Sequence, residues 1–231
     1  MRTFLLAVSA AIAFAAPAGA ATRNFGVQGF TKIRVEGPFK VTVSTGVPPF
    51  VRATGSQAGL DRVAVDIQSD TLIIRTGDSW GGYPGVDPGP VEINVGTHDL
   101  ISARVNGAGT ISIDKVKGLT FALAVQGSGA GEIGDVAIDQ LSVNLVGSAS
   151  AKLAGHAGKL TTLVRGVSSL DASALVTPAA QISADGSSTI DATVTDEAKV
   201  DAWGPATIRF AGHPSCTVKA AGTTSVSGCR P

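Results

Sequence analysis

The sequence predicts an all-β protein: a single-stranded parallel β-helix (a β-solenoid, expected to be right-handed) with coils of about 20 residues. Three observations support this prediction. A glycine-led turn recurs at a nearly constant period, apolar and polar residues alternate before each turn, and a second apolar residue follows each turn.

The recurring turn is the strongest of the three signals. The gaps between the first glycines of successive turns are 20, 20, 19, 20, 18 and 18 residues. A strand rises about 3.3 Å per residue, so one repeat traces roughly 60 Å, which suits one coil of a solenoid. It is too short for a βαβ unit of about 30 residues. The seven turns begin at Gly107, Gly127, Gly147, Gly166, Gly186, Gly204 and Gly222.

The residues before each turn alternate strictly. Positions two, four and six before the seven glycines are apolar in 20 of 21 cases, and Thr162 is the exception. The interleaved positions are polar or charged in 15 of 21 cases. A period of two predicts strands with one face buried and the other in water. One expected inward column is Val105, Val125, Leu145, Val164, Ala184, Ala202 and Ala220.

A second apolar residue follows each turn and predicts a short strand on the opposite wall of the coil. It lies four residues after the glycine in five repeats and six residues after it in the two that begin at Gly127 and Gly147. These residues are Ile111, Ile133, Leu153, Leu170, Ile190, Ile208 and Val226.

The first segment of the chain, residues 1–20, is predicted to be a signal peptide. Arg2 precedes an apolar run from Phe4 to Ala16, and a small-residue cleavage site ends at Ala20. That run is shorter than the roughly 20 residues needed to cross a bilayer, which disfavours an uncleaved anchor. Cleavage would leave 231 − 20 = 211 residues with a net charge of 17 − 18 = −1. We therefore expect an exported protein, periplasmic, on the outer surface or secreted, with no transmembrane segment in the mature chain.

The mature chain, residues 21–231, is expected to form one β-solenoid domain. Residues 24–100 are β-rich but less regular and are predicted to form N-terminal strands and a cap. Ser69-Asp70 is typical of a hairpin turn. The Gly/Pro-rich segment from Gly77 to Pro90 is predicted to be a surface loop.

Residues 101–231 are expected to form the regular coils and to end in a disulfide cap. Cys216 and Cys229 are the only cysteines, in a chain predicted to reach an oxidising compartment. A bridge between them would close a loop of about a dozen residues, worth roughly 2–3 kcal/mol. No metal site is predicted, because the three histidines are scattered and only His213 lies near the cysteines.

The order of segments resembles a known family. A Phe30-Thr-Lys-Ile-Arg-Val strand and a Phe39-Lys-Val-Thr-Val strand precede turns such as Asn106-Gly-Ala-Gly and Gln126-Gly-Ser-Gly. Over residues 29–212 this pattern resembles the head GIN domain of putative auto-transporter adhesins, a bacterial domain family of unknown function. The resemblance implies an exported β-solenoid of the bacterial envelope and transfers no catalytic residues.

Composition and motifs exclude several functions. With 18 basic and 18 acidic residues and no basic block, the chain lacks the charge pattern of a nucleic-acid-binding protein. The segment Gly127-Ser-Gly-Ala-Gly lacks the strand-to-helix context of a nucleotide loop and the Gly-x-Ser-x-Gly pattern of a nucleophile elbow. No cofactor is predicted.

An acidic column is the first candidate site. Asp171 and Asp191 occupy the same repeat position, and Arg209 follows in the next coil. Two carboxylates about 4.8 Å apart could bind Ca²⁺ or act as a polysaccharide-lyase or hydrolase pair. The favoured interpretation is a solvated column in which Arg209 offsets one charge.

Aromatic residues form the second candidate site. Trp80 and Tyr83 lie in one loop and include the only tyrosine of the chain. They could bind a partner, or fold over the side of the solenoid, which is the favoured interpretation. Trp203 is predicted to face outward beside charged residues, where it could stack on a sugar ring or, as favoured, cover a coil edge.

The predicted function is therefore non-catalytic: an envelope protein with a rigid surface for adhesion or scaffolding. An envelope glycan or another envelope protein would be its partner. The alternative is a carbohydrate-active enzyme that uses Asp171 and Asp191, an analogy that rests on the fold alone.

Overall fold

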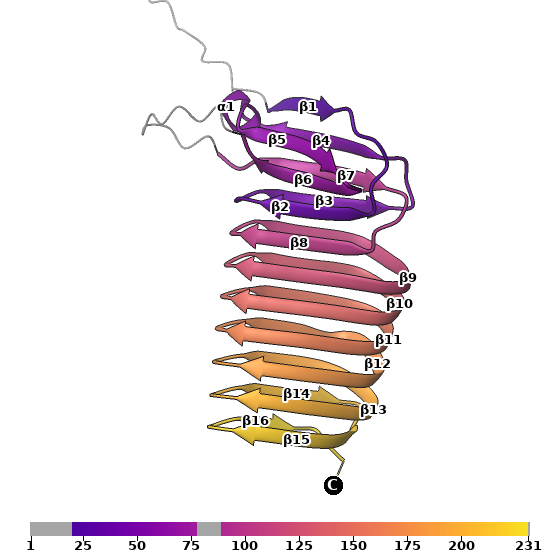
Figure 1. Ribbon diagram of the computed structural model, residues 1–231, viewed down its shortest axis with the longest axis vertical. Helices are drawn as coiled ribbons and strands as arrows, with labels where there is room; N and C mark the ends of the chain where they lie inside the picture. Colours follow the sequence, from indigo (N-terminus) through magenta and orange to yellow (C-terminus); the bar gives the residue numbers. More distant parts are fainter. Residues whose placement is uncertain (1–19, 78–88, 231) are drawn as a thin grey trace, which may run out of the picture.

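The structure, a computed structural model, describes residues 20–77 and 89–230. Within these residues the chain winds into a stack of coils that runs from the N-terminal to the C-terminal end of the molecule (Figure 1). The predicted β-solenoid with coils of about 20 residues is confirmed. No helix in the described ranges is long and apolar enough to cross a membrane.

The regular coils are made of parallel strands. Each of the long strands runs from one glycine turn to the next and bends round the opposite side of the solenoid, so that one strand contributes to both walls. The strands are β8 (Ser102–Gly107), β9 (Thr110–Gly127), β10 (Ala130–Gly147), β11 (Ser150–Gly166), β12 (Ser169–Asp185), β13 (Thr189–Trp203), β14 (Thr207–Ala211), β15 (Ser215–Ala221) and β16 (Ser225–Ser227).

The glycine turns lie directly on one another. Gly127 pairs with Gly107 and Gly147 pairs with Gly127 in the strand register. Gly127 has φ +107°, and a Cβ added there would lie 2.7 Å from the carbonyl oxygen of Gly107. Because each turn lies against the backbone of the turn before it, a side chain at this position would push neighbouring coils apart. This contact explains why glycine recurs.

The predicted stacking of the inward column is also confirmed. The register joins Val105 to Val125, Leu145, Val164, Ala184, Ala202 and Ala220 in successive coils. The first six residues are buried, whereas Ala220 in the last coil is exposed.

The alignment predicted for the residues after each turn needs correction, because Ile133 pairs with Ile113 rather than with Ile111. Gly131 stands opposite Ile111, and the side chain of Leu123 fills the space beside it: a Cβ on Gly131 would lie 3.1 Å from Leu123 Cδ2. The six-residue spacings after Gly127 and Gly147 therefore reach the next inward position of the strand, which Ile133 and Leu153 occupy. The turns themselves are not longer.

The N-terminal coils are stacked out of sequence order. Strand β2 (Lys32–Glu36) pairs in parallel with both β6 (Thr71–Thr76) and β8. Likewise β3 (Lys40–Thr45) pairs in parallel with β7 (Glu92–Thr97) and β9. The β2–β3 coil therefore lies between the β6–β7 coil and the first regular coil, although it comes first in the chain (Figure 1).

Antiparallel strands close the N-terminal end of the stack. Strand β5 (Val63–Gln68) pairs with β6, β4 (Phe50–Gly55) pairs with β7, and β1 (Ala21–Phe25) pairs with β4. Ser69 and Asp70, both with positive φ, form the predicted hairpin turn between β5 and β6. Strands β1 and β5 thus form the N-terminal edges of the stack, and β1 is a short strand of five residues that carries a charged residue, Arg23.

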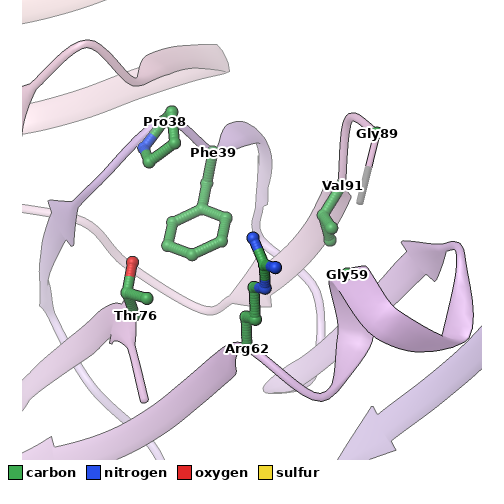
Figure 2. A pocket seen from close by; sticks show the side chains of 7 residues that line it. All are labelled: Pro38, Phe39, Gly59, Arg62, Thr76, Gly89 and Val91. Carbon is green, nitrogen blue, oxygen red and sulfur yellow. The ribbon is translucent and has the colours of Figure 1, made fainter. Parts of the chain in front are cut away.

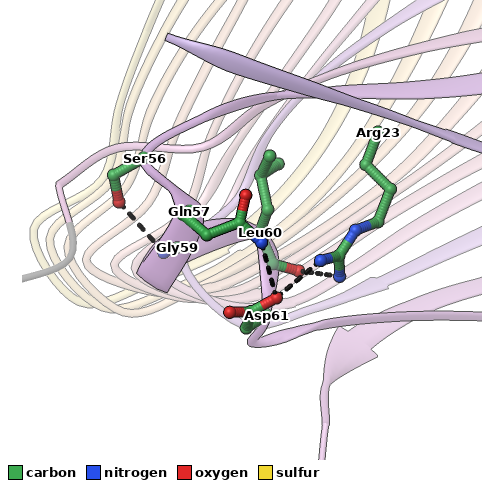
Figure 3. Close-up of polar contacts among 6 residues, drawn as sticks. All are labelled: Arg23, Ser56, Gln57, Gly59, Leu60 and Asp61. Carbon is green, nitrogen blue, oxygen red and sulfur yellow. Dashed lines mark hydrogen bonds and ion pairs between the residues drawn. The ribbon is translucent and has the colours of Figure 1, made fainter. Parts of the chain in front are cut away.

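A short helix holds these capping strands together (Figure 3). Helix α1 (Gln57–Leu60) is capped by Ser56, whose hydroxyl accepts a hydrogen bond of 3.0 Å from the Gly59 N–H. Arg23 of β1 donates to the Leu60 carbonyl at 2.9 Å and forms an ion pair of 2.5 Å with Asp61. One side chain thus joins the first strand to the helix that follows β4.

The C-terminal end is built differently. The structure joins Cys216 to Cys229 by a disulfide, as predicted. The last coil leaves apolar residues exposed: Val218 is 42% exposed, whereas Val200, one coil earlier in the same column, is 1% exposed.

The interior is mainly apolar, and the polar residues buried in the described ranges are Thr45, Thr97, Thr162, Ser168, Thr177 and Ser188. Thr162 is the one that already interrupts the apolar positions in the sequence. Thr162 is 2% exposed, and no hydrogen-bond partner of its hydroxyl is found in the described part of the chain. The outward positions are less uniform than the alternation predicts. Asn144 is half-buried, and its Oδ1 likewise has no partner among the described residues.

Candidate functional site

The acidic column forms where the sequence predicts it, on the outer face of three neighbouring strands. Asp171 of β12 pairs with Asp191 of β13, and Asp191 pairs with Arg209 of β14. All three residues follow a turn glycine by the same number of positions, so the stacking of the turns brings them together.

Asp191 is held by Arg209. The guanidinium donates from Nε to Asp191 Oδ1 at 2.6 Å and from Nη2 to Oδ2 at 2.8 Å. The hydrogen bond to Asp191, together with the charge of that carboxylate, raises the pKa of Arg209 above its usual value. A two-pronged contact of this kind uses both carboxylate oxygens. Both oxygens of Asp191 therefore already accept a hydrogen bond from Arg209.

Asp171 is held by its own neighbour in the chain. Its Oδ1 accepts a hydrogen bond of 2.5 Å from the Ser173 hydroxyl and one of 3.1 Å from the Ser173 N–H. These two hydrogen bonds, in that order of size, lower the pKa of Asp171, and the positive charge of Lys152 lowers it further. A general acid needs a pKa raised toward neutrality. The environment of Asp171 shifts its pKa the other way, which keeps the carboxylate ionised and disfavours a general-acid role.

A hollow of about 330 Å³ lies beside the two carboxylates. Its lining contains both polar and apolar residues. The described ranges contain no group of three or more His, Cys, Asp or Glu residues placed to hold a metal ion. The lining residues are Asp171, Ser173, Asp191, Ala192, Arg209, Phe210 and Ala211.

A shallow trough of about 410 Å³ runs across β3, β9, β10, β11 and β12 on the same wall. Its floor holds small residues that lie three positions after successive turn glycines: Thr110, Ala130, Ser150 and Ser169. Glu132, Lys152 and Asp171 line one side in successive coils. Sequence reasoning missed this trough, although the run of small residues at a fixed offset from the glycines could have indicated it.

The aromatic candidates do not form one site in the described structure. Trp203 is 54% exposed at the end of β13, where it pairs with Asp185 of β12 and Ala221 of β15. Its predicted outward position is therefore observed. Trp80 and Tyr83 lie outside the described residues.

The family described as "Putative auto-transporter adhesin, head GIN domain" matches residues 29–214. The chain belongs to this family. The resemblance inferred from the strand order and the Gly-Ser-Gly turns is thus confirmed over nearly the same residues.

Solved structures of members of the bacterial genera Bacteroides and Parabacteroides share the fold. A putative adhesin from Bacteroides fragilis superposes with a TM-score of 0.82 at 19% identity, covering 90% of this chain and 95% of that one. A putative lipid binding protein from Parabacteroides distasonis gives 0.71 at 18% identity, with 90% and 96% covered. A putative adhesin from Parabacteroides merdae gives 0.66 at 18% identity, with 90% and 95% covered. At these identities the likeness concerns the fold alone. None of the curated proteins compared matches this chain.

Proposed function

We propose that this head GIN domain protein is an exported, non-catalytic binding protein whose solenoid walls serve adhesion or scaffolding. One observation carries the proposal: both carboxylates of the acidic column, the residues best placed for catalysis, are already engaged, Asp191 by Arg209 and Asp171 by Ser173. They act as fixed surface charges on a wall that also carries the trough.

The repeated architecture favours binding of an extended partner. Equivalent outward side chains recur at the strand spacing of about 4.8 Å, so a wall offers the same kind of contact many times. Several weak contacts made together give strong attachment without any single deep pocket. The solved adhesin-like neighbours are consistent with such a role, and an envelope glycan or another envelope protein is the partner we propose.

Trp203 is the described residue best suited to anchor such a partner. It is more than half exposed and lies opposite Asp185 in the strand register. An exposed indole combines a large apolar face with a polar N–H, a combination that is enriched at interfaces. Trp80 and Tyr83 are proposed as a second aromatic contact.

The test is attachment of the purified mature protein to immobilised envelope glycans and to intact cells. Trp203→Ala and the pair Trp80→Ala with Tyr83→Ala should each weaken attachment at least about fivefold, corresponding to about 1 kcal/mol of contact energy. Val167→Ala is the matched control, because Val167 is 68% exposed but not aromatic. Circular dichroism should confirm that every variant keeps the fold.

The carboxylate pair provides the opposite arm of the test. Asp171→Asn with Asp191→Asn should leave attachment unchanged. Glycan cleavage by the wild-type protein that disappears in this double variant would instead establish a carbohydrate-active enzyme. Export is tested separately: N-terminal sequencing of the exported chain should begin at Ala21, and retention of residues 1–20 would contradict the predicted cleavage.

A further inference from the structure

The shallow trough that crosses β3, β9, β10, β11 and β12 is marked at both ends by ion pairs. At the N-terminal end Lys40 Nζ lies 2.7 Å from Glu92 Oε1, and at the C-terminal end Arg209 Nε lies 2.6 Å from Asp191 Oδ1. The first and last of the five strands are four strand spacings apart, or roughly 19 Å along the axis of the solenoid. The trough therefore runs across the strands and is long enough for a short polymer.

The alternation at the start of β3 shows which side chains face the trough. Phe39 and Val41 are buried, whereas Lys40 between them is exposed. Figure 2 shows the Phe39 ring turned toward a different hollow, which Thr76 and Arg62 also line. Because every second residue faces outward, each strand contributes two outward side chains to the trough. The floor row is Lys40, Thr110, Ala130, Ser150 and Ser169, and the side row is Thr42, Ser112, Glu132, Lys152 and Asp171.

Between the two ion pairs, most polar side chains of the trough have no partner on the protein. Glu132 and Lys152 stand opposite each other in the register, yet they form no ion pair in the described structure. Asp171 differs, because its Oδ1 accepts hydrogen bonds from Ser173. The hydroxyls without a hydrogen-bond partner in the described ranges are those of Thr42, Thr110, Ser112, Ser150 and Ser169. The trough thus offers two rows of hydrogen-bonding groups to a ligand.

We propose that the trough binds a neutral β-1,4-linked glycan laid along the solenoid axis, with one sugar on each coil. Such a glycan is extended, and each sugar advances its chain by close to the strand spacing of about 4.8 Å. Successive sugars therefore meet equivalent hydroxyls, while Glu132 accepts and Lys152 donates hydrogen bonds to sugar hydroxyls. Because these two charges offset each other, the trough has no excess of positive charge to attract a polyanionic glycan. The proposal rests on the proposed glycan-binding function and adds the site and the linkage of the ligand.

Nuclear magnetic resonance titration of the isotope-labelled mature protein with cellohexaose and chitohexaose locates the site directly. Both carry the β-1,4 linkage, and at least one of them should shift the amide signals of Thr110, Ser150 and Ser169. Maltohexaose, whose α-1,4 linkage curls the chain, should bind about tenfold more weakly. The amide signal of Trp203 should not move, because Trp203 precedes a turn glycine and lies outside the trough.

Two half-buried residues at the same distance after a turn glycine supply a matched pair of variants. Ser150→Gln removes a hydroxyl and places a longer side chain in the trough, so it should weaken glycan binding about tenfold. Thr207→Gln makes the same kind of change three coils further on, outside the trough, and should leave binding unchanged. Glu132→Gln with Lys152→Gln removes both charges and should weaken binding about fivefold. Thermal melts verify that each variant folds, and the charge variant carries the test if Ser150→Gln does not fold.

Several results would overturn the proposal. These are unmoved trough signals with both β-1,4-linked glycans, equally tight binding of maltohexaose, or equal losses in Ser150→Gln and Thr207→Gln. Attachment to cells without any shift in the trough, or with shifts confined to the region of Trp203, would overturn this proposal and leave the adhesive function standing. A wild-type protein that attaches neither to immobilised glycans nor to cells would contradict both.

Discussion

Replacing Thr162 by valine should make this protein more stable. Thr162 interrupts an apolar column of the interior: the register places Val143 on one side of it and Ile182 on the other. The residue is 2% exposed, and its Oγ1 has no hydrogen-bond partner in the described structure. Valine has the same branched shape, so the substitution exchanges a hydroxyl for a methyl group without changing the backbone.

The expected gain follows from the cost of burying an unpaired hydroxyl. That cost is about 1–3 kcal/mol when no hydrogen bond replaces those to water. Allowing for relaxation around the native side chain, we expect Thr162→Val to raise the free energy of unfolding by about 1–2 kcal/mol. In a chain of this size each kcal/mol shifts Tm by about 2–4 °C, so the expected rise is roughly 2–8 °C.

Urea denaturation and thermal melts of the mature protein measure this effect, and the adjacent residue supplies the control. Thr161 is exposed on the outer face, so Thr161→Val should change stability by no more than about 0.5 kcal/mol. If Thr162→Val were no more stable than the wild type, the hydroxyl would have a partner and the inferred interior would be wrong at this point. An equal gain in both variants would trace the effect to strand propensity instead of the interior.

Three further perturbations test other parts of the structure. Val143→Asp buries a charge at a position that is 1% exposed and should cost several kcal/mol, whereas Ser142→Asp on the exposed face should cost little; equal melting temperatures would refute the register. Cys216→Ala opens the C-terminal disulfide and should lower stability by roughly 2–3 kcal/mol; two titratable thiols in the natively exported wild type would contradict the bridge. The lowered pKa of Asp171 means that its hydrogen bonds stabilise the fold above pH 3.8 and are lost as the pH falls through the lower folded-state pKa. Asp171→Asn should therefore reduce the stability difference between pH 7 and pH 3 measured by urea unfolding, and an unchanged difference would refute this assignment.

The candidate site was predictable to the extent that it depends on the repeat. Asp171, Asp191 and Arg209 share one offset from a turn glycine, so their stacking could be inferred from counting residues. The hydrogen bonds from Ser173 to Asp171 could not, because they depend on a local irregularity: the register between β12 and β13 shifts after Ala172. Alternation alone gives no indication of such a shift.

The sequence by itself determined the regular coils. Each coil of a solenoid contacts mainly the coils next to it in the chain, so the residues of each repeat carry the pattern that places that repeat. Glycine at each corner and apolar residues at alternate positions were sufficient to predict the inward column. The two cysteines, in a chain expected to be exported, were sufficient to predict the disulfide near its end. Only the tertiary structure decided the order of the N-terminal coils, in which β2 and β3 lie between β6–β7 and β8–β9. Strands of similar alternation can pair in several orders, and the choice depends on contacts between residues distant in sequence.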